Sequence, residues 1–497
     1  MPVLLKGVHC LALVQFCIKR TLLFIRFFIL LNMDNMNDES GCISRRDFLK
    51  IVGAGTAAGV ALATFSGCGP GGQLSRGREV PVGQMTYRTN PRNGDKLSLL
   101  GFGMMRLPRI ARRRGESLPD TNDLDQEAVN ELVDFAIEHG VNVFDTASAY
   151  GKGFSEDVTG KALSRHPRDK YFVSTKLSNQ RPQARSREAS IEMYRKSFRD
   201  LQVDYIDYYF IHNVGNHATF KERFLDNGIL DFLMEEKAAG RIRNLGWSFH
   251  GQGEFFEYLC GAYDWDFVMI QLNYLDWGNV IGVGRTDVNA QHQYNIASAH
   301  NIPIWIMEPV MGGGLAMPHY KAQEHMVRAD PDASPASWAL RFAGSFPNVI
   351  TVLSGMTFMD HLKDNIITYS PLKPLSDSER EMLLGDVMEV MLQHRNILCT
   401  RCQYCMPCPY GIDIPEIFNH YNRSMNEGYY PADKQSEDFK RARRAFLVGM
   451  DRRVSKLRQA NRCINCGLCT STCPQRINIP REMRRIDKFI EDMRMEA

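Results

Sequence analysis

The chain has 497 residues, of which 44% are hydrophobic and 24% are charged. This length allows two or three domains, and the composition is normal for a globular protein. The formal net charge of +3 is close to neutral for a chain of this size, so the charge does not indicate a nucleic-acid partner.

A pair of arginines, Arg45 and Arg46, precedes an apolar run of small residues at positions 51–65. Residues 44–50 read Ser-Arg-Arg-Asp-Phe-Leu-Lys, which resembles a twin-arginine export signal. An amphipathic helix with a basic start is the alternative interpretation. The signal predicts a bacterial protein that is exported to the periplasm or anchored to the membrane there.

The apolar run ends in Phe-Ser-Gly-Cys at residues 65–68, which resembles a lipoprotein processing box with Cys68 as the lipidated residue. Phe65 stands where an aliphatic residue is usual, so an unmodified cysteine beside a cleavage site is the alternative. An earlier apolar stretch, 3–31, contains four Lys or Arg residues that would be costly inside a bilayer. We therefore expect translation to start at Met33 or Met36.

The N-terminal extension with its signal is thus predicted to occupy residues 1–68. The glycines at 53–59 imitate a dinucleotide-binding fingerprint but lack the preceding strand that this motif requires. Residues 69–93 are rich in Gly, Pro, Arg and Ser and are predicted to form a linker.

Apolar runs and helix-period segments alternate over residues 94–375. Helix-like segments include 125–139, 187–201, 230–239 and 335–346. The strand-like runs are 99–105, 142–146, 171–175, 205–211, 243–248, 267–273, 304–307 and 349–353. This alternation predicts an α/β fold, a (β/α)8 TIM barrel. A doubly wound sheet would use fewer strands and would need a glycine fingerprint after its first strand.

Four polar side chains stand where three successive predicted strands end: Asp145, Tyr150, Lys176 and His212. The carboxyl ends of barrel strands carry the chemistry in this fold. A tyrosine is a poor acid unless a cation lies close to it, and Lys176 could supply that cation. Asp145 would orient the lysine, and His212 would donate to the substrate oxygen. These residues predict proton delivery to a carbonyl that is being reduced.

The segment from about 97 to 370 resembles the aldo-keto reductases, because these four residues match that family's tetrad. Leu-Gly-Phe-Gly at 100–103 and Gly-Phe-Ser-Glu at 153–156 also match. The resemblance implies reduction of an aldehyde or ketone, or oxidation of an alcohol, with Tyr150 as general acid. It further implies nucleotide contacts at Ser248, Gln271, Asn273, Ser354, Gly355 and Asn365.

The resemblance breaks in two places that concern NAD(P)H. Residues 307–314 read Met-Glu-Pro-Val-Met-Gly-Gly-Gly, where the family carries an aromatic residue and then Ser-Pro-Leu. Residues 354–361 contain no Lys or Arg, although the family grips the adenosine phosphate with basic residues there. The missing cation should weaken recognition of a 2′-phosphate. Use of NADH, loose binding of NADPH and loss of nucleotide binding all stay open.

Eight of the thirteen cysteines form two short runs near the C-terminus. The first run comprises Cys399, Cys402, Cys405 and Cys408, and the second comprises Cys463, Cys466, Cys469 and Cys473. This spacing, with a proline after each run, predicts two [4Fe–4S] clusters. Zinc is the alternative, although zinc sites usually pair cysteines from two distant knuckles. In two-cluster ferredoxins the fourth cysteine of each run binds the other cluster, so we expect Cys408 and Cys473 to be exchanged.

The segments after the two runs are alike, Tyr-Gly-Ile-Asp-Ile-Pro at 410–415 and Gln-Arg-Ile-Asn-Ile-Pro at 475–480. Residues 376–497 therefore resemble a helical dicluster ferredoxin, a small and mainly α-helical domain. Nine Lys or Arg residues lie between positions 440 and 462. They indicate either a solvated helix face or a docking patch for an acidic redox partner.

Together these features predict an exported oxidoreductase of the aldo-keto reductase type that is coupled to, or supported by, two iron–sulfur clusters. Hydride carries two electrons whereas a cluster carries one, and no flavin motif is visible to join them. The alternative is an electron-transfer or binding subunit whose barrel no longer turns over nicotinamide.

Overall fold

The computed structural model describes residues 78–110, 123–251, 253–278, 289–394, 396–431 and 433–495. These residues belong to one compact unit, which spans residues 69–497. The expected export signal at 44–50 and the expected lipidated Cys68 lie outside the described residues. No helix within the described ranges is both long enough and apolar enough to cross a membrane.

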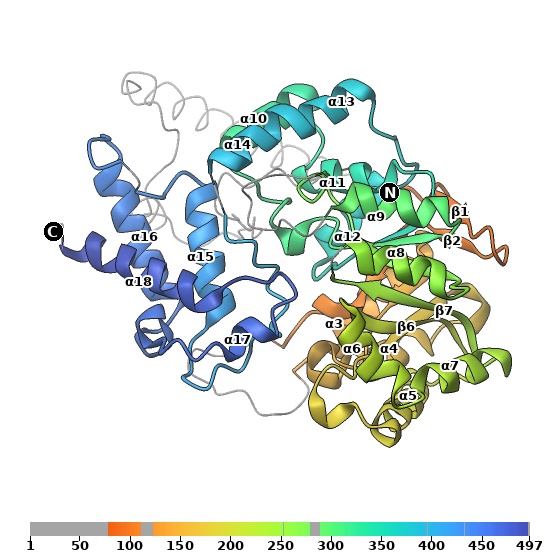
Figure 1. Ribbon diagram of the computed structural model, residues 1–497. Coiled ribbons are helices and arrows are strands. Elements are labelled where there is room, and N and C mark those ends of the chain that lie inside the picture. The colour runs from red at the N-terminus through yellow and green to blue at the C-terminus, as the bar shows by residue number, and fades with distance from the viewer. Residues whose placement is uncertain are drawn as a thin grey trace, which may run out of the picture. The chain divides into compact units, whose positions relative to one another are not determined.

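Eight parallel strands close into a barrel in the order β10-β3-β4-β5-β6-β7-β8-β9 (Figure 1). The strands are β3 (Leu100–Gly103), β4 (Val143–Asp145), β5 (Phe172–Leu177), β6 (Ile206–Val214), β7 (Ile242–Phe249), β8 (Phe267–Gln271), β9 (Ile304–Met307) and β10 (Val349–Ser354). Each of them overlaps one of the strands expected from the apolar runs. The predicted (β/α)8 barrel is therefore confirmed.

Helices connect successive strands, and polar side chains begin several of them. Asp125, Ser186 and Ser334 each accept a hydrogen bond from a backbone N–H three residues further along, which satisfies a donor that the helix itself leaves unpaired. The helices of the barrel region are α3 (Gln126–Glu138), α4 (Ser155–Leu163), α5 (Arg187–Leu201), α6 (His217–Phe220), α7 (Ile229–Ala238), α8 (Gly253–Ala262), α9 (Ala290–Ala299), α10 (Tyr320–Ala329), α11 (Pro335–Gly344) and α12 (Met359–Thr368).

Aromatic side chains fill the interior of the barrel. Tyr208, Phe210, Phe267 and Trp305 are fully buried, and their rings pack at centroid distances such as 4.8 Å for Tyr208–Trp305 and 4.5 Å for Phe210–Phe267. A filled interior leaves the loops after the strands as the place where a substrate can bind.

Part of the segment expected to be a linker, 69–93, is a strand. β1 (Tyr87–Thr89) pairs antiparallel with β2 (Lys96–Ser98). Asn90 donates to the Tyr208 hydroxyl over 3.2 Å, and the Arg88 guanidinium donates to the Gly344 carbonyl over 2.6 Å. These contacts with distant residues order a segment whose local composition is typical of a loop, so the linker prediction was wrong for residues 87–93.

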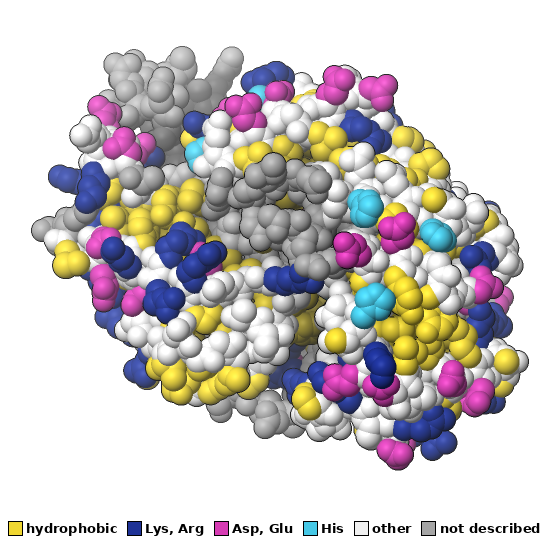
Figure 2. Space-filling model, viewed as in Figure 1, with side chains coloured by type: hydrophobic (Ala, Val, Ile, Leu, Met, Phe, Trp, Pro, Cys, Tyr) yellow, Lys and Arg dark blue, Asp and Glu magenta, His cyan; other side chains and the backbone are white. Residues whose placement is uncertain are grey.

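The C-terminal region is helical, as expected. It contains α13 (Asp377–Met382), α14 (Met388–Gln393), α15 (Ile414–Asn426), α16 (Phe439–Arg453), α17 (Leu468–Ser471) and α18 (Ile479–Met495). The two similar segments each lead into a helix that begins with Ile-Pro, α15 and α18. Both helices pack around a core that includes Phe418, Phe446 and Ile486. Lys and Arg side chains, with acidic ones among them, lie on the surface over α16 and α18 (Figure 2).

A pair of glycine substitutions tests the packing of the barrel helices. A Cβ atom on Gly160 of α4 would lie 2.2 Å from the Asp200 carbonyl oxygen, whereas a Cβ atom on Gly385 would meet nothing within 4 Å. Alanine gains about 0.5–1 kcal/mol over glycine in a helix, but overpacking against backbone costs about 1–3 kcal/mol. We expect Gly160→Ala to lower the urea unfolding midpoint and Gly385→Ala to leave it unchanged or raise it. Equal midpoints for the two variants would contradict this packing.

Candidate active site and cysteine sites

A buried ion pair lies at the carboxyl end of β4 and β5. Lys176 Nζ is 2.5 Å from Asp145 Oδ2 and 2.6 Å from Oδ1, and it also donates to the Thr146 carbonyl over 2.7 Å. Ser174 donates to the same carboxylate over 2.6 Å. Burial raises the pKa of Asp145 and lowers that of Lys176, while attraction between the two groups opposes both shifts. Asp145 therefore holds the ammonium group in one position, as expected.

Tyr150 and His212 lie next to this pair. Lys176 Nζ is 4.9 Å from the centroid of the Tyr150 ring, and the Tyr150 and His212 rings meet edge to face with centroids 5.8 Å apart. The structure thus brings all four predicted residues together from three successive strands and the turn after β4.

The protonation states of Tyr150 and His212 follow from their burial. Burial raises the pKa of Tyr150 well above its usual value, so the phenol keeps its proton. Burial, and then the charge of Lys176, lower the pKa of His212 well below its usual value, so the imidazole is neutral at pH 7. His212 Nδ1 is 2.7 Å from Ser178 Oγ, and Nε2 is the ring nitrogen that this contact does not use.

The residues expected to contact the nicotinamide amide are bonded within the protein. Gln271 Nε2 donates to Glu308 Oε2 over 2.8 Å, and Asn273 Nδ2 donates to the Glu308 carbonyl over 3.1 Å. Asn273 also donates to Asp276 over 2.9 Å. Ser248 Oγ accepts from the Asn213 backbone N–H over 2.8 Å.

The residues expected at the far end of the nucleotide lie after β10. Asn365 donates to Ser354 Oγ over 2.8 Å. The face of Gly355 is covered by Arg106, because a Cβ atom on this glycine would lie 3.1–3.3 Å from three carbons of the arginine side chain. A basic residue therefore does lie beside this loop, but it comes from the segment after β3.

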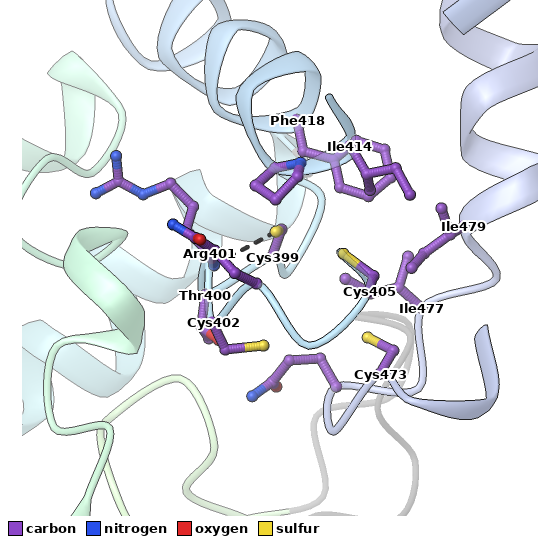
Figure 3. A pocket seen from close by; sticks show the side chains of 13 residues that line it. Cys399, Thr400, Arg401, Cys402, Cys405, Ile414, Phe418, Cys473, Ile477 and Ile479 are labelled. Atoms are coloured by element: carbon purple, nitrogen blue, oxygen red, sulfur yellow. Dashed lines mark hydrogen bonds between the residues drawn. The ribbon is translucent and has the colours of Figure 1, made fainter. Parts of the chain in front are cut away.

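Four thiols surround one cavity in the C-terminal region. Cys399, Cys402, Cys405 and Cys473 line a space of about 320 Å³ that is partly open to solvent, and their sulfur atoms face it (Figure 3). The other wall is apolar and is formed by Ile414, Phe418, Ile477 and Ile479. The Arg401 backbone N–H donates to Cys399 Sγ over 3.4 Å. The first three cysteines of one run thus share a cavity with the last cysteine of the other run.

The remaining thiols are also neighbours. Burial raises the pKa of Cys469, and the thiols of Cys408, Cys463 and Cys466 raise it further. In each grouping, the fourth cysteine of one run lies with the first three cysteines of the other run. This is the arrangement expected from the sequence.

The thiols of the first cavity come from both cysteine runs and line a space between them. An iron–sulfur cubane occupies such a space between four cysteine ligands. The lining of the first cavity therefore fits a cluster.

Comparison with known proteins agrees with both parts of this geometry. Residues 99–383 match the model of the Aldo/keto reductase family, and residues 398–479 match that of the 4Fe-4S dicluster domain. The chain belongs to the aldo/keto reductase family. It carries an additional 4Fe-4S dicluster domain.

The share of this chain that aligns differs from one relative to another. The chain is 32% identical to Aldo-keto reductase YhdN of Bacillus subtilis over 24% of this chain and 37% of that protein. It is 27% identical to Protein tas of Escherichia coli over 57% of this chain and 92% of that protein. The first five curated relatives are matched over less than half of their length, between 37 and 48%. Among solved structures, the holo form of the aldo-keto reductase AKR11C1 from Bacillus halodurans is 23% identical, with 60% of this chain and 95% of that chain covered and a TM-score of 0.47.

Three further residues influence Tyr150, and the sequence did not mark them as site residues. Tyr404, Glu308 and Arg106 all act electrostatically on Tyr150, the first two raising its pKa and the third lowering it. Arg106 is therefore a cation near the phenol in addition to Lys176. Glu308 was visible in the sequence as a departure from the family pattern, whereas Tyr404 lies between two cysteines and was hidden by the cluster motif.

Paired cysteine substitutions test the grouping of the thiols. Cys399→Ala together with Cys473→Ala removes two residues from one cavity, so about half of the iron should remain bound. Cys399→Ala together with Cys408→Ala removes one residue from each grouping, so both clusters should be lost or converted. Iron analysis and EPR of anaerobically purified protein measure both variants. The opposite pattern would show that each run binds its own cluster.

Proposed function

We propose that this family member reduces an aldehyde or ketone, or oxidises an alcohol, with Tyr150 as the group that exchanges a proton with the substrate oxygen. The observation that carries the proposal is the buried Asp145–Lys176 ion pair beneath a protonated phenol and next to a neutral imidazole. Burial of a charged pair is costly, and the place of this pair at the carboxyl end of the barrel, beside a phenol, suits proton transfer and orientation.

Each member of the tetrad has a distinct part in this chemistry. In the reductive direction the C=O π bond breaks, and the oxygen takes the phenolic proton of Tyr150. The carbon takes two electrons and one proton, either together as hydride from a reduced nicotinamide or as two single electrons from the clusters with a proton from water. Lys176 stabilises the phenolate that remains, and Asp145 keeps the ammonium charged and oriented. His212 Nε2 is the nitrogen available to hold the carbonyl oxygen, because Nδ1 contacts Ser178.

The dicluster domain supports a redox role for the C-terminal region. We propose two [4Fe–4S] clusters, one with Cys399, Cys402, Cys405 and Cys473 and one with Cys408, Cys463, Cys466 and Cys469. Bound clusters would supply one-electron transfer, which a carbonyl reduction needs twice. A second candidate function, an electron-transfer or binding subunit that does not turn over nicotinamide, is favoured by the internal bonding of Gln271 and Asn273.

Export by the twin-arginine route is part of the same proposal. Residues 44–50 support it, as does the need of a cluster-bearing protein to fold before it crosses a membrane. Lipidation of Cys68 would then attach the protein to the membrane surface.

The surface near the second group of thiols supports a redox partner. Cys466 is exposed, and close to it in the chain Leu457, Ile464 and Leu468 are 69, 58 and 61% exposed. Lys456 and Arg462 in the same stretch are also exposed. An apolar centre with a basic border fits an acidic one-electron carrier, which positive charge would steer to this surface.

Charge reversal tests this docking surface. Lys456→Glu with Arg462→Glu should slow electron transfer from a reduced acidic ferredoxin about tenfold at low salt, and high salt should reduce the difference. Lys170→Glu, on the exposed surface of the barrel, is the control and should have little effect. Stopped-flow absorbance of the clusters measures the rate, and an equal response of the two variants would place docking elsewhere.

Tyr150→Phe tests the proposed proton donor. The variant removes one oxygen atom and should lower the rate of benzaldehyde reduction about 10²–10⁴-fold. The assay is run with NADPH and, separately, with reduced methyl viologen as electron donors. Tyr258→Phe, on the exposed face of α8, is the matched control and should keep the full rate. If Tyr150→Phe also keeps the full rate of benzaldehyde reduction, Tyr150 is not the proton donor.

A further inference from the structure

The groove in which this family would hold its nicotinamide nucleotide contains parts of the protein itself. The amides of Gln271 and Asn273 are bonded to Glu308, and Arg106 lies over Gly355. A nucleotide in the family position would have to displace each of these contacts. The residues present therefore do not fit NAD(P)H.

We propose that the loop of residues 399–405 takes the place of a nicotinamide nucleotide in this barrel and that Arg106 and Glu308 hold it there. This seating of the loop is independent of the proposed function.

Arg106 joins the barrel to this loop. Its guanidinium donates to the Thr400 carbonyl, and its own carbonyl accepts from Thr357 Oγ1 over 2.8 Å. Burial lowers the pKa of Arg106, the charge of Glu308 raises it, and the thiols of Cys402 and Cys399 raise it as well. One arginine thus lies between the loop after β10, the carboxylate of Glu308 and the first cysteine loop.

Glu308 forms the second link. Its Oε2 atom accepts from Gln271 of β8 and from Gln475, each over 2.8 Å. Gln475 is 4% exposed and follows Cys473, which lines the first cavity. A single carboxylate oxygen therefore ties a residue expected to bind nicotinamide to the segment that completes the cysteine cavity.

The backbone of the loop also packs directly against the barrel. A Cβ atom on Gly312, in the turn after β9, would lie 2.4 Å from the Thr400 carbonyl oxygen and 2.7 Å from Thr400 Cα. Gly312 has a φ of 62°, which also favours glycine. The side chain of Arg401, which belongs to the cysteine loop, reaches the same turn. Its guanidinium donates to the Gly312 carbonyl over 3.5 Å.

Both departures from the family pattern then have one explanation. Met307 stands where an aromatic side chain would stack on nicotinamide, and the next residue, Glu308, accepts from Gln475 beside the cysteine cavity. Residues 354–361 carry no cation for a phosphate, and Arg106 covers Gly355 while it holds Thr400.

Nucleotide binding to the cluster-loaded protein is the direct test. We expect calorimetric titration with NADH and with NADPH under anaerobic conditions to show no saturable binding up to about 1 mM, a concentration that corresponds to about −4 kcal/mol. Saturable binding of either nucleotide below that concentration would overturn the inference.

A pair of glycine substitutions tests the seating of the loop. Gly312→Ala and Gly411→Ala both place a side chain at a positive φ, 62° and 73°, but only the first would meet Thr400. Hydrogen exchange of the amides at 400–405 should become about tenfold faster in Gly312→Ala and stay unchanged in Gly411→Ala. Equal exchange in both variants would overturn the inference, and the titration of the unaltered protein decides it if Gly312→Ala does not fold.

The two proposals fail separately. A failure of Tyr150→Phe to slow the reaction would refute the proposed function, while the titration and exchange results would still report on the loop.

Discussion

One carboxylate oxygen, Glu308 Oε2, accepts hydrogen bonds from both Gln271 and Gln475 and so joins the barrel to the cysteine-rich region. A partly buried carboxylate between two amide donors is well satisfied, and a nearby guanidinium, Arg106, balances its charge. Removing it would take away the acceptor that Gln271 and Gln475 share.

The ion pair of Asp145 and Lys176 belongs to a different layer of the same site. It lies below Tyr150, within the strands, and is held by Ser174 and the Thr146 carbonyl. Glu308 and Arg106 form a second, upper layer in the loops, where they bond to Gln475 and to Thr400 of the cysteine-rich region. In the lower layer, Lys176 Nζ is 4.9 Å from the centroid of the Tyr150 ring. The proposed proton transfer uses the lower layer, and the proposed seating of the cysteine loop uses the upper one.

The sequence predicted the lower layer and the cysteines well, because both are local patterns. Strand ends follow from apolar runs, and the cysteine spacing needs only a few neighbouring residues. The upper layer was not predictable in the same way, since Arg106 and Thr400 are 294 positions apart and no periodicity links them. The strand at Tyr87–Thr89 was missed for the same reason, because Asn90 and Arg88 find their partners at Tyr208 and Gly344. Only the departure from the family pattern at Met307 and Glu308 marked the place.

The position of Cys473 has a consequence for biosynthesis. The first cavity has three thiols from one run and its fourth from residue 473. A ribosome makes the barrel strands before it reaches residue 473, so the cavity is still incomplete while the barrel is being synthesised. A cluster held by all four thiols would therefore be completed only after residue 473 has been made.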